Sequence, residues 1–403
     1  MAHGGHTART PDALPAAPAG GTPTPDPTTG GSRLRAHLRA WKPVYLAFAL
    51  SRLLVFAVGW GAELAMRVTG ASPDTWRPFA FAETYPHYAN VATNGYTLEN
   101  AFNHPVLPAF MAAGDAVGIP MWLAAFVVTN VAFLAGLVGV AVLGERYVGP
   151  AAARRGAVYL AIAPFGYWFS VTSTEGLLLA CIAGSALLAL RGTPLAWLGA
   201  GALGAVAVLT RPPGVLLGVL LLCIAIGQLA SRRLGVRGTA AAVAAGAMIP
   251  GALLAFFAYL GARTGDPLAS MHAQEDFNRE MTLDGPFRAL ASGLQNTLAG
   301  SIGQAIELVA TFGAAALLVL FVTNAVGRRA EVRGWVLFGA ASLLLPLSTG
   351  VLWQMPRFAL LIPPVFWMLG ALGSRPWLHR AVLVLFPVAL AVKVAAAVVG
   401  VEG

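Results

Sequence analysis

The stretch "MWLAAFVVTNVAFLAGLVGVAVLG", residues 121 to 144, decides the fold class of this chain. It carries no charged side chain and exceeds the roughly 20 residues that a helix needs to cross the hydrocarbon core of a bilayer. Backbone groups in hydrocarbon must find their hydrogen bonds within the protein, and a single apolar segment achieves this as an α-helix. The stretch therefore predicts a transmembrane helix.

Similar apolar runs recur along the whole chain. Hydrophobic residues make up 57% of the sequence and charged residues only 11%, against about 25% charged in a soluble globular domain. We therefore expect an all-α polytopic membrane protein with about eleven transmembrane helices. The expected spans are 43–67, 121–144, 156–172, 175–190, 194–210, 214–230, 239–262, 303–326, 334–352, 357–373 and 380–400. The segment 105–117 is too short to cross and is expected to lie in the interface or to re-enter.

The N-terminal region has a different composition from the rest of the chain. Its first 32 residues are mainly Pro, Gly, Ala and Thr, so they offer little apolar surface to offset the entropy of ordering. We expect residues 1–40 to form a disordered basic cytoplasmic tail. Residues 41–403 are expected to form one transmembrane domain in the bacterial plasma membrane.

The charge distribution predicts sidedness. The net charge of +9 could indicate a nucleic-acid partner. With the N-terminus in the cytoplasm, however, most of the 26 basic residues fall in the inner connections, as the positive-inside rule requires. We therefore expect membrane lipids and no nucleic acid as partners. The longest outer loops, 68–104 and 263–302, place the expected chemistry on the extracytoplasmic face.

Three charged residues stand at the expected outer ends of spans: Glu175 in "TSTEGLLL", Arg211 in "LTRPPGVLL" and Arg357 in "WQMPRFALL". Each could be an interfacial residue whose side chain reaches water. Their common level instead favours one shared site, because charges near membrane helices tend to line cavities or to pair. Arginine can hold a phosphate through two parallel hydrogen bonds, so Arg211 and Arg357 are candidate phosphate ligands.

Other features receive weaker interpretations. Asp266 in "TGDPLASM" is a candidate second acid or an ordinary turn aspartate. Arg52 and Lys393 lie deeper in apolar runs and are assigned no role. "GAGALG", residues 199 to 204, matches a dinucleotide fingerprint but lies inside an expected span, which predicts close helix packing instead. The histidines show no metal-ligand spacing, so no metal or other cofactor is assigned, although a metal requirement stays open.

Several motifs resemble those of one family. "YPHYANVATNGY" (85–96) followed by "AFNHPVLPAF" (101–110) resembles the first outer loop of the PIG-V type mannosyltransferases, membrane enzymes of the GT-C class. "STEGLLL", "LTRPPG", "GDPLA" with the later "AQ", and "MPRF" are similar to further motifs of that family, in the same order. The resemblance covers about residues 45 to 375. The residues that match the first loop in register are Tyr88, Ala92, Gly95, Tyr96, Pro105 and Pro108.

The resemblance implies a GT-C-like fold and transfer of a sugar, expected to be mannose, from a polyprenyl-phosphate donor to an unknown acceptor. It implies a carboxylate base, and Glu83 is the candidate because Thr84 stands where the family has its aspartate. Asp266 is then the second acid. The implied substrate-binding residues are Tyr88, Tyr96, His104, Glu175, Arg211, Gln274 and Arg357.

Two alternatives remain beside this interpretation. A transporter or flippase of lipid-linked substrates would place charges deep between repeated halves, and no convincing internal repeat is found. A catalytically inactive homologue is favoured by the Thr84 departure.

Overall fold

The computed structural model describes residues 28–70, 84–275, 281–323 and 330–400 of the 403-residue chain. The chain divides into two compact units, Met1–Lys42 and Pro43–Gly403. The described residues contain helices and no strand, which confirms the all-α prediction. The α-helices are α1 (Thr28–Val68), α2 (Thr84–Asn94), α3 (Val106–Ala116), α4 (Met121–Val148), α5 (Pro150–Ala161), α6 (Glu175–Ala189), α7 (Pro194–Thr210), α8 (Leu217–Ala230), α9 (Val236–Thr264), α10 (Ala269–Glu275), α11 (Gly285–Leu298), α12 (Ile302–Thr323), α13 (Ala330–Leu347), α14 (Met355–Ala359), α15 (Pro363–Leu372) and α16 (Pro376–Val399). Two 3-10 helices, η1 (Gly166–Phe169) and η2 (Pro212–Leu216), complete the set.

Helix α1 begins earlier than the sequence predicts. It starts at Thr28, so residues 28–40, which were expected in the disordered tail, are helical. Residues 1–27 lie outside the described part of the chain.

Seven helical segments of the described chain are long and apolar enough to cross a membrane, which supports an integral multi-pass protein. They are Arg39–Val68, Met121–Val148, Pro212–Ala230, Val236–Thr264, Ile302–Thr323, Ala330–Leu347 and Pro376–Val399. Four further apolar helices are shorter, namely Val106–Ala116, Glu175–Ala189, Pro194–Thr210 and Pro363–Leu372. The predicted number of eleven spans is therefore not confirmed.

Two expected spans are broken in the structure. The expected span 156–172 is helical only to Ala161, and the chain then runs through η1. The expected span 357–373 is divided into α14 and α15, because Pro363 and Pro364 begin a new helix and cannot continue the previous one. The hydropathy pattern missed both breaks because each lies within a continuous apolar run.

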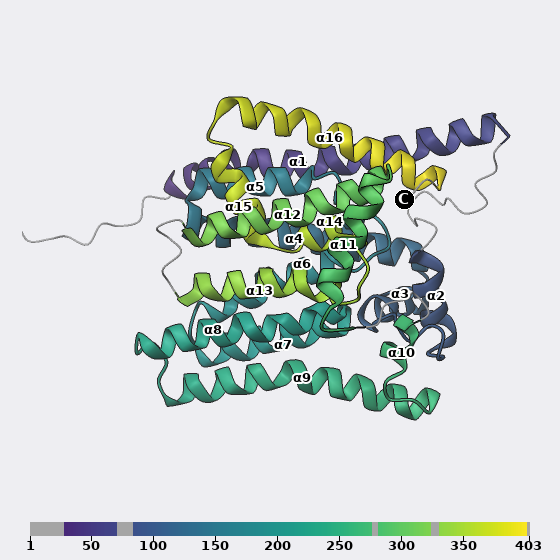
Figure 1. Cartoon of the computed structure of the whole chain (residues 1–403). Helices are drawn as coiled ribbons and strands as arrows, with labels where there is room; N and C mark the ends of the chain where they lie inside the picture. The colour runs from purple at the N-terminus through teal and green to yellow at the C-terminus, as the bar shows by residue number, and fades with distance from the viewer. Residues whose placement is uncertain (1–27, 71–83, 276–280, 324–329, 401–403) are drawn as a thin grey trace, which may run out of the picture. The chain divides into compact units, whose positions relative to one another are not determined.

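Helices α4, α6, α7 and α9 follow one another as packed neighbours in the second unit (Figure 1). Glycines allow the close approach that this packing requires. A Cβ atom added to Gly201 of α7 would lie 2.5 Å from the Cα of Ala245 in α9, closer than real Cβ atoms approach. The interpretation of "GAGALG" as a helix-packing motif is thereby confirmed.

The irregular segment between α5 and α6 is held by polar side chains of its neighbours. Arg52 donates from Nη2 to the carbonyls of Ala161 and Gly166, each at 3.2 Å. From α4, Thr129 donates to the Ser173 carbonyl at 3.1 Å and Asn130 to the Ser170 carbonyl at 3.2 Å. Backbone groups outside a regular helix need such partners at membrane depth. The segment can therefore leave the helical path just before Glu175.

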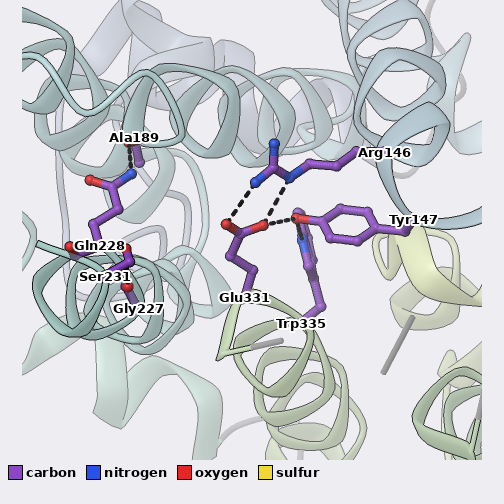
Figure 2. A network of polar contacts seen from close by, with 8 residues as sticks. All are labelled: Arg146, Tyr147, Ala189, Gly227, Gln228, Ser231, Glu331 and Trp335. Carbon is purple, nitrogen blue, oxygen red and sulfur yellow. Dashed lines mark hydrogen bonds and ion pairs between the residues drawn. The ribbon is translucent and has the colours of Figure 1, made fainter. Parts of the chain in front are cut away.

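A second polar network joins the far end of α4 to α13. Figure 2 shows Arg146 paired with Glu331 through two hydrogen bonds of 2.9 and 2.8 Å. Tyr147 donates to the same carboxylate at 3.4 Å and accepts from Trp335 Nε1 at 3.2 Å. Because α4 rises about 1.5 Å per residue, Arg146 lies roughly 25 Å along the helix from Thr129. We regard this network as a structural link, separate from the site below.

Candidate functional site

Glu175, Arg211 and Arg357 meet at one point, as the sequence led us to expect. The side chain of Glu175 is fully buried, with 0% of its surface exposed. Its Oε1 atom accepts hydrogen bonds from Arg211 Nη1 and from Arg357 Nε. The three residues come from positions up to 182 apart in the sequence, so their meeting is a property of the fold.

The ends of three short elements bring these side chains together. Glu175 is the first residue of α6, Arg211 is the C-cap of α7, and Arg357 lies in the last turn of the five-residue α14. An acid at a helix N-terminus and a base at a C-terminus are both favoured by the helix dipole. After Arg211, Pro212 starts η2, which ends α7 at this level.

The charge balance of the cluster favours an anion. Two guanidinium groups share one carboxylate, so the three side chains carry a formal charge of +1. Both arginines use Oε1, and the buried Glu175 Oε2 has no hydrogen-bond partner among the residues that the structure describes. Two like-charged guanidinium groups are thus held close together, and a phosphate that bound there would accept hydrogen bonds from both of them.

Each guanidinium group lies near an aromatic ring. The Cζ atom of Arg357 lies 3.7 Å from the ring centroid of Trp168, and that of Arg211 lies 5.1 Å from the ring of Phe358. A cation over an aromatic face is attracted by the ring quadrupole, most strongly over tryptophan. Trp168 belongs to η1, so the break after α5 supplies this contact.

Arg357 also lines a small cleft that is partly open to solvent. Aromatic and charged side chains from four parts of the chain line it: Phe165, Tyr167, Trp168, Glu307, Trp353, Gln354, Arg357 and Lys393. Its cations can contact an anionic group, and its aromatic side chains can contact an apolar surface beside that group.

Glu307 of α12 holds the segment that carries Arg357. Its carboxylate accepts from the backbone N–H groups of Gln354, at 3.0 Å, and Met355, at 2.6 Å. Gln354 adopts the left-handed conformation with φ 58°, and its Oε1 accepts from Arg357 Nη1 at 3.0 Å. Sequence reasoning assigned no role to Glu307, although an acid within an apolar span is the kind of signal that could have identified it.

The predicted residues of the first outer loop are packed into the protein. Tyr88 belongs to a buried cluster with Leu107 and Met111. Tyr96 donates to the Asn103 carbonyl at 2.7 Å, and burial raises the pKa of its hydroxyl. None of the contacts described for Tyr88 or Tyr96 is with Glu175, Arg211 or Arg357.

His104 connects this loop to the end of α7. Its Nδ1 atom lies 2.7 Å from the carbonyl of Val208, and because a carbonyl only accepts, Nδ1 carries the proton. Burial lowers the pKa of His104 to about 4, the Val208 hydrogen bond opposes this, and the charge of Arg211 lowers it further. His104 is therefore a neutral neighbour of the arginine cluster.

The remaining predicted residues lie elsewhere or outside the described chain. Asp266 accepts from Leu268 N at 2.9 Å and pairs with His272 Nδ1 at 2.7 Å, and the His272 hydrogen bond lowers its pKa. None of these contacts is with the arginine cluster, and the assignment of Asp266 as second acid stays a prediction. Gln274 lies on α10. Glu83 falls outside the described residues, so its assignment as base stays a prediction.

Within the described residues, no group of three or more His, Cys, Asp and Glu could hold a metal ion.

Comparison with known proteins identifies the fold. No family model matches the sequence, and no curated protein matches it. Among solved structures, ArnT from Cupriavidus metallidurans bound to undecaprenyl phosphate is similar, with a TM-score of 0.51, 16% identity, and coverage of 84% of this chain and 62% of that one. The oligosaccharyltransferase of Archaeoglobus fulgidus in complex with Zn and sulfate matches with a TM-score of 0.43, 14% identity, and coverage of 87% and 51%. AglB from the same organism, in complex with an inhibitory peptide and a dolichol-phosphate, matches with a TM-score of 0.44 and 13% identity. The match covers 89% of this chain and 54% of that one.

The chain spans less than two thirds of the length of each of these structures. At such identities the likeness is one of fold, and it rests on the ArnT comparison, whose TM-score exceeds 0.5. The predicted GT-C-like helical membrane fold is thus confirmed: this chain shares its fold with ArnT.

Proposed function

We propose that this protein is a GT-C type glycosyltransferase of the PIG-V kind. It moves a sugar, expected to be mannose, from a polyprenyl-phosphate donor to an acceptor on the extracytoplasmic face. The observation that carries the proposal is the convergence of Arg211 and Arg357 on the buried Glu175, beside an aromatic cleft. The resemblance of the sequence motifs and the fold shared with ArnT, whose structure holds undecaprenyl phosphate, support it.

In the proposed reaction, an acceptor hydroxyl oxygen bonds to the anomeric carbon of the donor sugar. The bond from that carbon to the phosphate oxygen breaks, and its electron pair leaves with the phosphate. A carboxylate takes the hydroxyl proton. Arg211 and Arg357 hold the phosphate, because their forked donors match its oxygens and are already in place before charge develops there.

Glu175 has the role of keeping the two arginines together. Without an anion between them, two guanidinium groups repel each other, and one shared carboxylate offsets that repulsion. The proposal assigns the base to Glu83 and a second acid to Asp266. Tyr88, Tyr96, His104 and Gln274 complete the proposed substrate-binding set.

The test is sugar transfer by the purified full-length protein. Labelled polyprenyl-phosphate mannose is supplied with candidate acceptors, and consumption of the donor is followed. Alanine at Arg211 or at Arg357 is expected to reduce turnover by about two to three orders of magnitude, the effect of removing one preorganised donor. Arg191→Ala is the matched control, because Arg191 is an exposed arginine in the connection between α6 and α7.

Folding must be separated from chemistry in this test. Each variant is checked by thermal unfolding, since removal of one partner of a buried ion pair can destabilise by about 3 to 5 kcal/mol. Arg211→Lys and Arg357→Lys keep the charge but lose the fork, and they are expected to fold and to transfer slowly. Undiminished consumption of donor by folded alanine variants would overturn the assignment of the arginines.

A binding protein without catalysis is the second candidate, favoured by Thr84 at the position of the expected aspartate. Such a protein would bind polyprenyl-phosphate mannose and form no product with any acceptor. Glu83→Ala separates the two candidates further, because it is expected to stop transfer and to leave donor binding unchanged. Transfer that continues in this variant would remove Glu83 as the base.

A further inference from the structure

Lys393 is a charged residue within an apolar helix. It lies on α16, whose membrane-length segment has a mean hydropathy of 2.6. A charged side chain within a membrane helix is costly, and such residues usually face a cavity and mark a functional site. Lys393 is half-buried, and it lines the same cleft as Arg357.

Lys393 has an aromatic neighbour and an acidic neighbour in the cleft. Its Nζ atom lies 5.0 Å from the ring centroid of Phe165, in the segment that carries Trp168. It is also close enough to Glu307 for the two charges to interact. The Glu307 carboxylate also accepts hydrogen bonds from two backbone N–H groups at the start of α14, so Lys393 is not its sole partner.

The formal charges of the cleft do not cancel. Arg357 and Lys393 are the cations and Glu307 is the carboxylate among the lining residues. Arg357 also shares Glu175 with Arg211, and the five charged side chains together carry a formal charge of +1. Four of the other five lining residues are aromatic. The cleft therefore suits a group that combines an anion with an apolar or sugar-like surface, and a phosphate ester has this chemistry.

We propose that Lys393 is a third phosphate-binding cation. It contacts the phosphate ester of the donor from α16, whereas the two arginines come from the end of α7 and from α14. This inference rests on the proposed function and adds a residue to its site. A polyprenyl-phosphate sugar is a phosphodiester with one negative charge. When the bond to the anomeric carbon breaks, the phosphate leaves as a monoester and carries about −1.5 to −2 at neutral pH.

The extra charge decides which kinetic constant Lys393 affects. Two arginines, partly neutralised by Glu175, match the donor before reaction. Lys393 would contact a phosphate oxygen on which negative charge increases as the phosphate departs. An interaction that strengthens in the transition state raises kcat and leaves the binding of the donor nearly unchanged.

The chain offers a direct binding test, because Lys42 and Lys393 are its only lysines. The full-length Lys42→Met protein, in lipid nanodiscs, is reductively methylated with ¹³C-formaldehyde. Methylation keeps the lysine charge, and Lys393 then gives the single lysine NMR signal, distinct from that of the α-amino group. The signal is followed during titration with undecaprenyl phosphate, with inorganic phosphate and with undecaprenol, which lacks the phosphate.

A shift with undecaprenyl phosphate and none with undecaprenol is the expected result. A shift with inorganic phosphate as well supports an anion site that needs no lipid tail, and its absence supports a site that needs one. No shift with either phosphate compound, or an equal shift with undecaprenol, would overturn the proposal. The second outcome would show that Lys393 responds to the lipid tail.

Turnover provides the second readout. Lys393→Met is expected to lower kcat about ten- to hundredfold and to change the KM for the donor by less than about threefold. Lys393→Arg should recover most of the rate, and Lys42→Met, at an exposed lysine of α1, should equal the wild type. If the wild type transfers sugar and Lys393→Met matches it, the role of Lys393 fails and the proposed function stands. If the wild type transfers none, the proposed function fails, and the NMR titration still decides whether Lys393 binds phosphate.

Discussion

At the scale of single residues, the site is built from charges that compensate one another. Glu175 is completely buried, and such a carboxylate is tolerated because two arginines neutralise it. His104, by contrast, stays neutral. It donates a hydrogen bond from Nδ1 to the Val208 carbonyl and lies near Arg211 without adding positive charge. The segment between α2 and α3 thus contributes a hydrogen-bonded neutral ring to the neighbourhood of the cluster.

His104 makes stability depend on pH. Its pKa is about 4 in the folded protein and about 6.5 in an unfolded chain, so the unfolded state binds the proton more readily. The folded protein should therefore lose stability as the pH falls from about 6.5 to about 4, by up to about 1.4 kcal/mol per pH unit, with no further loss from this group below that range. Thermal unfolding across this pH range measures the effect.

His104→Asn keeps a hydrogen-bond donor and removes the titration, so its stability should fall less over the same range. His87→Asn, at an exposed histidine of α2, should behave as the wild type. An equal loss of stability in His104→Asn and in the wild type would assign the pH dependence to other groups.

At the scale of elements, short and broken helices position the chemistry. Helix α14 has five residues, and η1 has four, yet they supply Arg357 and Trp168. Long helices such as α4 and α9 form the scaffold, and glycines bring the neighbouring helices into close contact. The position of Arg211 therefore depends on how closely α7, whose end it caps, packs against α9.

Gly201 tests this dependence. A methyl group added there would meet the Ala245 Cα at 2.5 Å and the Ala245 Cβ and Met248 Sδ at 2.8 Å, so Gly201→Ala should destabilise the protein by about 1 to 3 kcal/mol through overpacking. Gly246 of α9 has nothing within 4 Å of the added atom, so Gly246→Ala should raise helix stability slightly, by about 0.5 to 1 kcal/mol. Thermal unfolding of the two variants in the same detergent compares them. Equal stabilities would mean that α7 and α9 do not pack this closely.

At the scale of the whole molecule, the proposed reaction requires the cluster to face the extracytoplasmic side. Helix α9 is a candidate membrane span. Ser231 lies in the connection before it and Leu268 in the loop after it, and both residues are exposed. Charge distribution predicts Ser231 inside and Leu268 outside. Single cysteines at these positions report the orientation once Cys181 and Cys223 have been replaced by alanine.

A membrane-impermeant maleimide applied to intact cells should label Leu268→Cys and should leave Ser231→Cys unlabelled until the cells are permeabilised. The reverse pattern would place the loop that follows α9 in the cytoplasm and would contradict an extracytoplasmic site.

The sequence by itself determined that this protein lies in a membrane and that Glu175, Arg211 and Arg357 lie at the ends of its helices. Runs such as 121–144 require helices in a bilayer whatever surrounds them, because the backbone must satisfy its own hydrogen bonds there. Prolines beside Arg211 and Arg357 marked helix ends, and this placed both arginines at one level with Glu175.

Only the tertiary structure decided which side chains share a cavity. Hydropathy cannot locate the breaks after Ala161 and before Pro363, because apolar residues continue through both. Nor could it pair Glu307 with the backbone of Gln354, or place Lys393 in the cleft of Arg357, because these contacts join helices distant in sequence. Such contacts depend on the rotation and depth of each helix, which packing against several neighbours sets together.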